Sequence, residues 1–460
     1  MISLPLEVLC RQLPACIISY DTKYLRLAVV TPPPPDITDA LRFASQRQIE
    51  FEYWPQARIE SQRRQQSSHS LSLAEPEPQT VPLIAEQLLS RAIQQRASDI
   101  HLESTPLGPV IRLRIDGLLH PTPLTASCTA EALVARFKVL AGLDIAETRL
   151  PQDGQLSLTL DGENHSFRLS TLATRCGEKL VIRRLRSVKQ ALAPAQLGFD
   201  KDDLQQVLTI LRQPQGMILV TGPTGSGKTF TLYSLLSQLN TPDKNLSTVE
   251  DPIEIPLEGV NQTQLNSKAG LDFSLILRAL LRQDPDVIMI GEIRDNDTAD
   301  IAVKAAQTGH LVLSTLHTNS TGETLIRLRQ MGIAGYLLAA SLRLVIAQRL
   351  VRKLCTHCRH PAGTEIRLPA SVRKSPLGHW LADGCDHCFS GYYGRIALFE
   401  ILPVCGALHQ AIASDASPET LREIACRQGG RSLFSTGINA VEKGITSWSE
   451  ILRVIGGNRE

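Results

Sequence analysis

Short apolar runs alternate with amphipathic stretches in the second half of the chain, from residue 197 onward. Buried strands are predicted at 217–220, 246–249, 287–290 and 311–314. Leucines at helical spacing predict a helix at 230–239, directly after the first of these strands. Buried strands that alternate with helices are typical of a parallel sheet covered by helices. We therefore expect an α/β domain over 197–460.

The pattern before residue 197 is different. An amphipathic helix is predicted at 82–96. Alternation of apolar and polar residues predicts strands at 99–103, 110–115, 156–160, 167–172 and 179–185. The Asp-Gly pairs at 116–117 and 161–162 are typical of turns. This stretch, 81–188, is expected to be a mixed α+β domain.

The first 60 residues predict a small α/β domain. A strand at 25–30, a short helix at 37–46 and a second strand at 49–53 make up the pattern. Residues 61–80 are rich in Ser, Gln, Glu and Pro and predict a linker, and residues 189–196 predict a second one.

The last part of the chain is expected to be mainly helical after Arg395, with a helical part over 400–460. Amphipathic stretches predict helices at 417–427 and 447–455.

Composition narrows the class of protein. The 460 residues are 43% hydrophobic and 20% charged, which is ordinary for globular protein. The formal net charge of +2 gives no overall argument for nucleic-acid binding. The longest apolar run, 336–351, is interrupted by Arg343 and Arg349, so no membrane span is predicted. No signal peptide is predicted either, and we expect a cytosolic protein with reduced cysteines.

One octapeptide follows the strand at 217–220 and opens the helix at 230–239. Its residues are Gly222, Pro223, Thr224, Gly225, Ser226, Gly227, Lys228 and Thr229. They fit the phosphate-binding loop, or P-loop, in the context that this motif requires. Glycines let backbone N–H groups approach phosphate oxygens, and the helix N-terminus adds partial positive charge. Lys228 is expected to reach the β- and γ-phosphates of a nucleotide, and the Thr229 hydroxyl to hold Mg²⁺.

Polar clusters follow the other three predicted strands, at 250–254, 291–295 and 315–319. Ligands of open α/β sheets bind beyond the carboxyl ends of the strands, so these clusters are expected to meet at the nucleotide. Glu292 is placed to orient or deprotonate water, and Glu250 is the rival base. His317 is expected near the γ-phosphate, with a structural histidine as the alternative. His310, at a strand start, is a weaker candidate.

Two Cys-x-x-Cys pairs predict a metal site. Cys355 and Cys358 form one half, and Cys385 and Cys388 form the other. Four thiolates suit tetrahedral Zn²⁺ in a structural site. His357, His360 and His387 are alternative ligands at this point. The other cysteines are isolated, and buried packing is their default interpretation.

Several of these motifs resemble the ATPases of type II secretion and type IV pilus assembly. The matching stretches are Thr248 to Glu254, Leu281 to Asp286, Gly291 to Asp295, Thr308 to His310, Leu316 to Asn319, Ser98 to His101, Arg114 to Gly117, and Leu150 to Gly154. The resemblance covers residues 80–460 and is nearest to the short, general-secretion-pathway-E-like members of enterobacteria.

The resemblance implies a multi-domain α/β protein. An α+β, PAS-like N-terminal domain would precede a RecA-type P-loop ATPase core with a tetracysteine zinc insert at about 351–396. ATP would be surrounded by Glu250, Asp251, Glu254, Glu292, His310 and His317. Arg168 and Arg183 would reach the γ-phosphate from the domain before the core; without the resemblance, both would be solvated strand-face arginines.

The resemblance also implies partners and a location. Family members are hexamers at the cytoplasmic face of the inner membrane. They act on a polytopic platform protein, with a membrane-anchored recruiting protein as a further partner, and turn ATP hydrolysis into pilus or pseudopilus assembly. The N-terminal domain of this chain resembles only the latter half of the family's usual one. The tetracysteine insert resembles assembly and secretion members.

Two other functions compete with this interpretation. A DNA-uptake or conjugation motor would use the same core, but the near-zero net charge and the lack of an aromatic and basic stripe argue against it. A scaffold that binds nucleotide without hydrolysing it is disfavoured by Lys228, Glu292 and His317. We expect an ATP hydrolase that has no nucleic-acid partner.

Overall fold

The computed structural model describes residues 15–20, 24–33, 48–56, 59, 80–106, 108–124, 128–160, 162–185, 193–266, 269–370, 372–428 and 430–456. The chain divides into two compact units, Met1–Thr80 and Val81–Glu460. The predicted helix at 37–46 lies outside the described residues, as do residues 61–79 of the first linker and 189–192 of the second. The finer domain boundaries stay predictions.

The first unit contains a three-stranded sheet. Its strands are β1 (Ala15–Tyr20), β2 (Tyr24–Val29) and β3 (Gln48–Tyr53). β2 lies in the middle, antiparallel to β1 and parallel to β3. β2 and β3 are the strands that the apolar pattern predicts, whereas β1 was not predicted.

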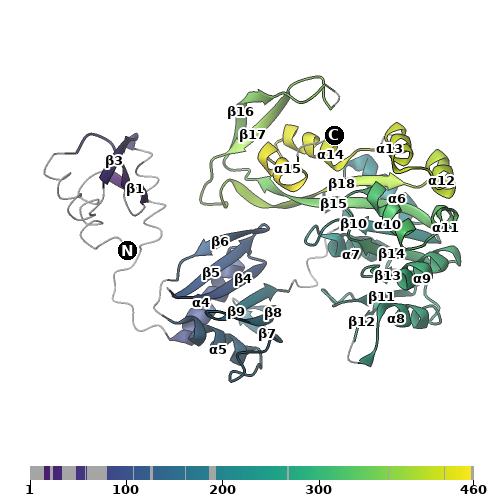
Figure 1. The fold of residues 1–460 in the computed structure, drawn as a ribbon, viewed down its shortest axis with the longest axis horizontal. Helices are drawn as coiled ribbons and strands as arrows, with labels where there is room; N and C mark the ends of the chain where they lie inside the picture. Colours follow the sequence, from purple (N-terminus) through teal and green to yellow (C-terminus); the bar gives the residue numbers. More distant parts are fainter. Residues whose placement is uncertain are drawn as a thin grey trace. The chain divides into compact units, whose positions relative to one another are not determined.

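The second unit begins with a six-stranded antiparallel sheet (Figure 1). Its elements are α4 (Val81–Gln94), β4 (Asp99–Thr105), β5 (Gly108–Ile115), β6 (Leu118–Thr122), α5 (Ala130–Leu140), β7 (Gln152–Leu160), β8 (Glu163–Thr174) and β9 (Gly177–Arg184). The strand order is β6-β5-β4-β9-β8-β7. Leucine, isoleucine and phenylalanine side chains from one face of the sheet pack on α4 and α5, and this core excludes water from the domain.

A seven-stranded sheet forms the centre of the rest of the chain. Its strands are β10 (Gly216–Thr221), β11 (Leu246–Glu250), β12 (Asn261–Gln264), β13 (Val287–Ile290), β14 (Leu311–Leu316), β15 (Leu342–Leu354) and β18 (Tyr392–Pro403). The order is β12-β11-β13-β14-β10-β15-β18, and only the edge strand β18 runs antiparallel to its neighbour. β10, β11, β13 and β14 confirm the four strands predicted from apolar runs.

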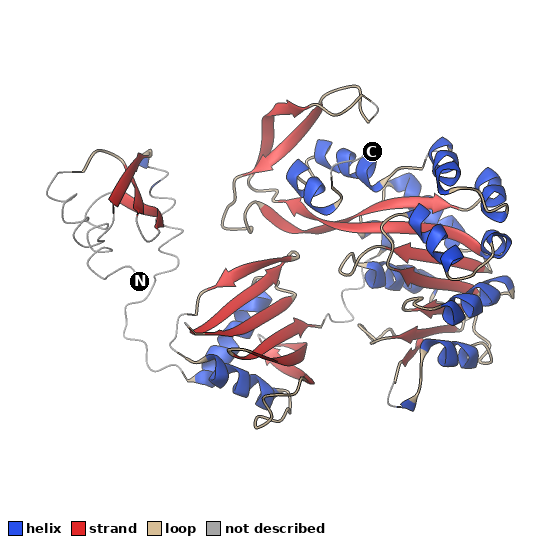
Figure 2. Cartoon of the chain, viewed as in Figure 1, coloured by secondary structure: helices blue, strands red, loops and turns tan. Residues whose placement is uncertain are grey.

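Helices cover both faces of this sheet (Figure 2). α6 (Lys201–Leu211) and α7 (Lys228–Leu239) contribute to one core, and the short helix η2 (Pro194–Gln196) lies beside α7. The other core contains side chains of α8 (Phe273–Leu280), α9 (Asn296–Gln307), α10 (Thr321–Gln330), α11 (Gly335–Ser341), α12 (Gly406–Ala413) and α13 (Pro418–Arg427). Burial on both faces explains why the central strands are mostly apolar, with small hydroxyl residues as the main exceptions in β11 and β14.

The long pair β15 and β18 corrects one expectation. The chain was expected to be mainly helical after Arg395, but β18 continues to Pro403 and pairs with β15 along most of its length. The hairpin β16 (Arg359–Ile366) and β17 (Leu377–Ala382) lies between the two cysteine pairs in the sequence. α14 (Leu433–Glu442) and α15 (Trp448–Val454) then pack on the outer half of β15. Among the described residues, no helix is long and apolar enough to cross a membrane.

Candidate functional site

The P-loop follows the central strand β10, and α7 begins at its lysine. Gly222, Gly225 and Gly227 all have positive φ angles. A Cβ atom on Gly222 would lie 2.5 Å from a backbone oxygen of β15 and 2.7 Å from the Ser226 hydroxyl, so only glycine fits there. The backbone thus has the close-packed turn that phosphate binding by N–H groups requires.

Lys228 lies inside this turn. Its side-chain Nζ donates to the carbonyl oxygen of Gly222 at 2.8 Å and to that of Pro223 at 3.3 Å. Burial lowers the pKa of Lys228 to about 8; the Glu292 carboxylate raises it and the Arg349 guanidinium lowers it further. The ammonium is therefore held where phosphate oxygens are expected, by partners that a phosphate can replace.

Two threonine hydroxyls tie the P-loop strand to the end of β14. Oγ1 of Thr221, the last residue of β10, lies 2.5 Å from Oγ1 of Thr318 and accepts the Thr318 backbone N–H at 3.0 Å. The Thr221 hydroxyl is also within 3.1 Å of the Leu316 carbonyl oxygen. Both threonines are buried. The loop that carries His317 is therefore fixed relative to the start of the P-loop.

Glu292 follows β13 and is the centre of a charged group at the carboxyl edge of the sheet. Its carboxylate pairs with the Arg294 guanidinium and lies 2.9 Å from Nε2 of His317, while Arg294 also reaches Asp251 at 3.5 Å. Burial raises the pKa of Glu292, but hydrogen bonds from Arg294 and His317 outweigh it, so the net pKa is below its usual value. Glu292 is thus a carboxylate at neutral pH, able to accept a proton or orient water.

Glu250, the rival base, has a different environment. It is 2% exposed and accepts hydrogen bonds from the hydroxyls of Tyr233 and Thr248 and from the side-chain amide of Gln262. Burial and the bond to Glu250 together raise the pKa of Tyr233. Both carboxylate oxygens are therefore used in holding β11, α7 and β12 together.

The remaining candidates at the nucleotide divide into two groups. Asp251 and Glu254 are exposed in the loop after β11, and Thr229 is exposed in the first turn of α7. His310 precedes β14, and its Nδ1 lies 3.1 Å from the Ala305 carbonyl oxygen. Since the P-loop follows a strand parallel to β14 and in register with it, His310 lies at the opposite edge of the sheet. A strand of this length spans roughly 20 Å, so His310 does not join the group around the P-loop of its own chain.

Arg168 and Arg183 occupy opposite positions on neighbouring strands of the six-stranded sheet. The next residue along this row is Asp99, whose carboxylate lies 2.9 Å from Nε of Arg183. Arg114 continues the row at 3.8 Å from Asp99. Directly opposed residues of an antiparallel pair share a face of the sheet. Asp153 lies 3.8 Å from Arg168, so three arginines stand beside two carboxylates and the group keeps an excess of positive charge.

The four predicted metal ligands lie together. Cys355 follows β15, and its Sγ is 3.7 Å from that of Cys385; Cys358 and Cys388 are 3.8 Å apart. All four sulfurs lie within 4.8 Å of one another. A tetrahedral site with Zn–S bonds near 2.3 Å has S···S edges of about 3.8 Å, so the donor set fits zinc. The alternative ligands His357, His360 and His387 are not in this cluster among the described residues.

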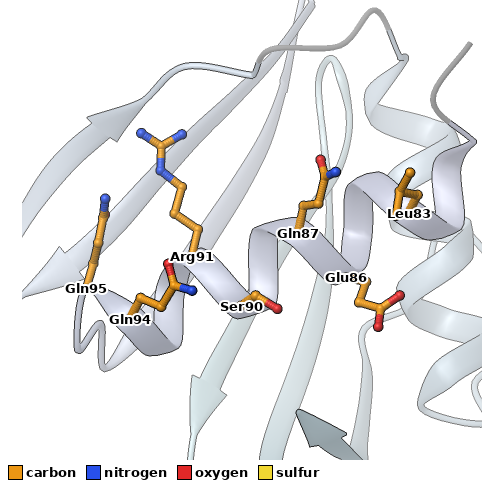
Figure 3. Close-up of a pocket in the computed structure, with 7 residues that line it drawn as sticks. All are labelled: Leu83, Glu86, Gln87, Ser90, Arg91, Gln94 and Gln95. Atoms are coloured by element: carbon orange, nitrogen blue, oxygen red, sulfur yellow. The ribbon is translucent and has the colours of Figure 1, made fainter. Parts of the chain in front are cut away.

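A shallow hollow runs along the outer face of α4 (Figure 3). Its lining residues are Leu83, Glu86, Gln87, Ser90, Arg91, Gln94 and Gln95. All belong to α4 or its C-terminal turn, and most are polar. This surface is a solvated helix face, and none of the predicted site residues lies on it.

Sequence reasoning missed several residues that build the site. Gln348 and Arg349 of β15 reach the P-loop and the loop after β14. Their signal was the interruption of an apolar run by polar residues, which was used only to exclude a membrane span. Asp99 belongs to a motif but had no role assigned, and Tyr233 was one more position on an amphipathic helix.

Comparisons with known proteins agree with this geometry. A family profile described as "Type II/IV secretion system protein" matches residues 74–453. The "Protein transport protein HofB homolog" of Escherichia coli (strain K12) is 52% identical over 452 residues, covering 98% of each chain. The "Type IV pilus assembly ATPase PilB" of Pseudomonas aeruginosa is 46% identical over 387 residues, which cover 83% of this chain and 68% of that relative.

Two solved structures share the fold. The Legionella pneumophila ATPase DotB superposes with a TM-score of 0.61 at 22% identity, covering 82% of this chain and 96% of DotB. The pilus retraction motor PilT, solved with bound ADP, has a TM-score of 0.53 at 25% identity and covers 80% and 95% of the two chains. Mixed α/β sheets are thus common to this chain and its structural neighbours.

Proposed function

The chain belongs to the type II/IV secretion system protein family, as its motifs predicted, and on that premise we propose that it is an ATPase that drives assembly of type IV pili or of type II secretion pseudopili. The observation that carries the proposal is the pairing of two groups at one sheet edge. Lys228 lies buried inside the P-loop that follows β10. The Glu292 carboxylate, which is paired with Arg294 and His317, follows β13, two strands away from β10 in the sheet.

In this proposal the P-loop binds the phosphates of ATP. The backbone N–H groups of Gly225 to Thr229 and the Lys228 ammonium supply the positive end of the interaction. Lys228 leaves the carbonyl oxygens of Gly222 and Pro223 when phosphate oxygens arrive. Mg²⁺, held by the Thr229 hydroxyl, supplies charge neutralisation to the phosphates when it is bound.

Glu292 is the general base or water-positioning residue that we favour. Its carboxylate is ionised at neutral pH and its side chain is 16% exposed, so water can reach it. Glu250 is buried and already accepts three hydrogen bonds, a state that suits a structural role. His317 is exposed beside Glu292 and is proposed to sense the γ-phosphate. Asp251 and Glu254 are proposed to line the site.

Arg168 and Arg183 are proposed to stabilise the charge that develops on the transferred phosphoryl group. Arginines supplied in cis or by a neighbouring subunit have this role in other P-loop enzymes. The charge balance supports the idea, because three arginines are opposed by only two carboxylates, Asp99 beside Arg183 and Asp153 beside Arg168.

The assembly that we propose is a homo-hexamer, with a PAS-like domain before a RecA-type core. It would be cytoplasmic and peripheral at the inner membrane, working on a platform protein of the pilus or secretion machine and recruited by a membrane-anchored protein. The four cysteines would hold one structural Zn²⁺, because four thiolates leave no open position for water.

Turnover of purified full-length protein tests the proposal. Wild-type protein should hydrolyse ATP in the presence of Mg²⁺, and Lys228→Ala should lose ATP binding because it removes the charge paired with the phosphates. In cells that depend on this gene for pili or secretion, Lys228→Ala should fail to complement a deletion. Wild-type protein that neither binds nor hydrolyses ATP would contradict the proposal, and turnover that requires DNA would favour a DNA-uptake motor.

A further inference from the structure

Gln348 is a buried residue of β15 that lies against the P-loop. The strand runs parallel to β10, and Ala347 pairs with Thr221, the last residue of β10. Gln348 is therefore the first residue of β15 beyond the end of β10. Its side chain is large and polar, yet the residue is only 2% exposed. Buried amides of this kind almost always have hydrogen-bond partners.

The amide of Gln348 has one hydrogen-bond partner at each end. Its Nε2 donates to the backbone carbonyl oxygen of Ser226 at 2.7 Å. Its Oε1 accepts the hydroxyl of Thr231 in α7 at 2.7 Å. A carbonyl oxygen can only accept, so the amide nitrogen must face Ser226, and the hydroxyl then suits the remaining oxygen. The orientation of the amide is thus fixed by its two partners.

The contact with Ser226 also orients the backbone N–H of the next residue, Gly227. In a trans peptide the carbonyl oxygen of one residue and the N–H of the next point in opposite directions within one rigid plane. Holding the Ser226 oxygen toward Gln348 therefore directs the Gly227 N–H away from Gln348. Resting on the function proposed above, we propose that Gln348 is a positioning residue that sets the direction of the Gly227 N–H for nucleotide phosphate.

The surrounding glycines support this role. A Cβ atom on Gly227 would lie 3.0 Å from Nε2 of Gln348, and one on Gly222 would lie 2.5 Å from the Gln348 carbonyl oxygen. That carbonyl also accepts a hydrogen bond from Arg349 at 3.0 Å, and Arg349 extends to the Asn319 carbonyl oxygen at 3.2 Å. Both ends of the P-loop are therefore packed on one residue, which is itself tied to the loop after β14.

Nucleotide binding by two variants of the full chain tests the proposal. Gln348→Met keeps the length of the side chain and removes both hydrogen bonds. Gln348→Leu also removes both hydrogen bonds and introduces no charge beside the nucleotide. Fluorescent ADP with Mg²⁺ is the binding probe, and ATP turnover gives KM and kcat. Both variants should raise the Kd for ADP and the KM for ATP by about ten-fold, the equivalent of one hydrogen bond, with kcat changed by less than about three-fold.

Thr446→Val is the matched control. The Thr446 hydroxyl is fully buried and donates to the Arg352 carbonyl oxygen at 2.8 Å, four residues further along β15 than Gln348. Its loss should lower stability and leave Kd and KM at their wild-type values. A structural role alone for Gln348 would lower stability in the same way and leave nucleotide affinity unchanged.

The possible results distinguish the proposed ATPase function from the positioning role of Gln348. Wild-type protein that fails to bind ADP would overturn the proposed function, and this inference with it. Wild-type binding with an unchanged Kd in Gln348→Met would overturn the inference alone. An equal loss of affinity in Thr446→Val would also overturn it, because any weakening of β15 would then suffice. If Gln348→Met does not fold, Gln348→Leu and Thr231→Val provide the same comparison, the latter with a smaller rise in Kd.

Discussion

Arg168 and Arg183 stand directly opposite each other on β8 and β9, with the Asp99 carboxylate 2.9 Å from the second of them. Asp153 lies 3.8 Å from Arg168, so each arginine has one carboxylate beside it, and with Arg114 the group keeps a net positive charge that suits an anion. Arg168→Ala and Arg183→Ala are therefore expected to keep the wild-type fold and oligomeric state and to cut ATPase turnover ten-fold or more. Turnover measured beside size-exclusion light scattering checks this.

Arg112→Ala is the control for the arginine pair. Arg112 lies on β5 of the same sheet and makes an ion pair of 2.6 Å with Glu103, so its loss should leave turnover near wild type. Wild-type turnover in both Arg168→Ala and Arg183→Ala would remove the arginines from the mechanism.

The two glutamates are expected to respond differently to the same change. Glu292→Gln should still bind ATP but turn over about 10²–10⁴-fold more slowly, because it removes the base while keeping the shape. Glu250→Gln should mainly lower the thermal midpoint, because an amide cannot accept all three of the hydrogen bonds that the carboxylate accepts. Turnover per folded molecule, with melting curves, compares them. The reverse pattern would make Glu250 the base.

Removal of one thiolate should remove the metal. Cys385→Ser is expected to reduce zinc from one per chain to near zero and to lower the thermal midpoint by about 5 °C or more, since structural zinc contributes directly to folding free energy. Elemental analysis and melting curves measure both. Cys405→Ser is the control, because Cys405 is exposed and lies outside the sulfur cluster. Wild-type protein without zinc, and with all four thiols freely titratable, would contradict the assignment.

Nucleotide affinity should depend on pH through Lys228. Its pKa is about 8 in the nucleotide-free protein, lowered from 10.5 chiefly by burial. The ammonium is half lost at about pH 8 and is nearly complete only a pH unit or more below it, so the Kd for ADP should be level near pH 7 and rise above about pH 8, toward a limit of about ten-fold per pH unit. Binding titrations across pH 7 to pH 10 test this.

The lowered pKa of Lys228 affects folding stability in the opposite direction to nucleotide affinity. Between about pH 8 and pH 10.5 the unfolded chain binds more protons at Lys228 than the folded one, so this group makes unfolding harder as pH rises. In Lys228→Arg the charge persists, and both trends should disappear. A wild-type Kd that does not change with pH would show that Lys228 stays charged throughout.

The sequence predicted which candidate residues follow neighbouring strands. β10 and β13 are buried on both faces and read as apolar runs, and β11 and β14 are buried as well, although each contains a Ser-Thr pair. Parallel pairing then brings Lys228, Glu292 and His317 to one edge without further information. The two Cys-x-x-Cys pairs predicted the sulfur cluster equally well, because a metal site needs its ligands close together.

Other parts of the site depend on contacts that sequence does not encode locally. Glu250 lies in an acidic stretch, but the three donors that bury it come from separate places, Tyr233 on α7, Thr248 two residues earlier and Gln262 on β12. His310 was grouped with His317, although six strand residues separate them and place them at opposite edges. β15 was missed because Gln348, Arg349 and Arg352 interrupt its apolar pattern while their side chains satisfy partners elsewhere.

The hydroxyl contact between Thr221 and Thr318 bears on the entropy of binding. It joins the start of the P-loop to the segment that carries His317, so folding itself has already restricted the backbone on both sides of the nucleotide. Restricting a residue that is still free costs about 1–2 kcal/mol for the backbone alone. A nucleotide bound as proposed would not incur that loss at these residues. Nucleotide binding would still restrict side chains, chiefly that of Lys228 and the half-exposed ring of His317.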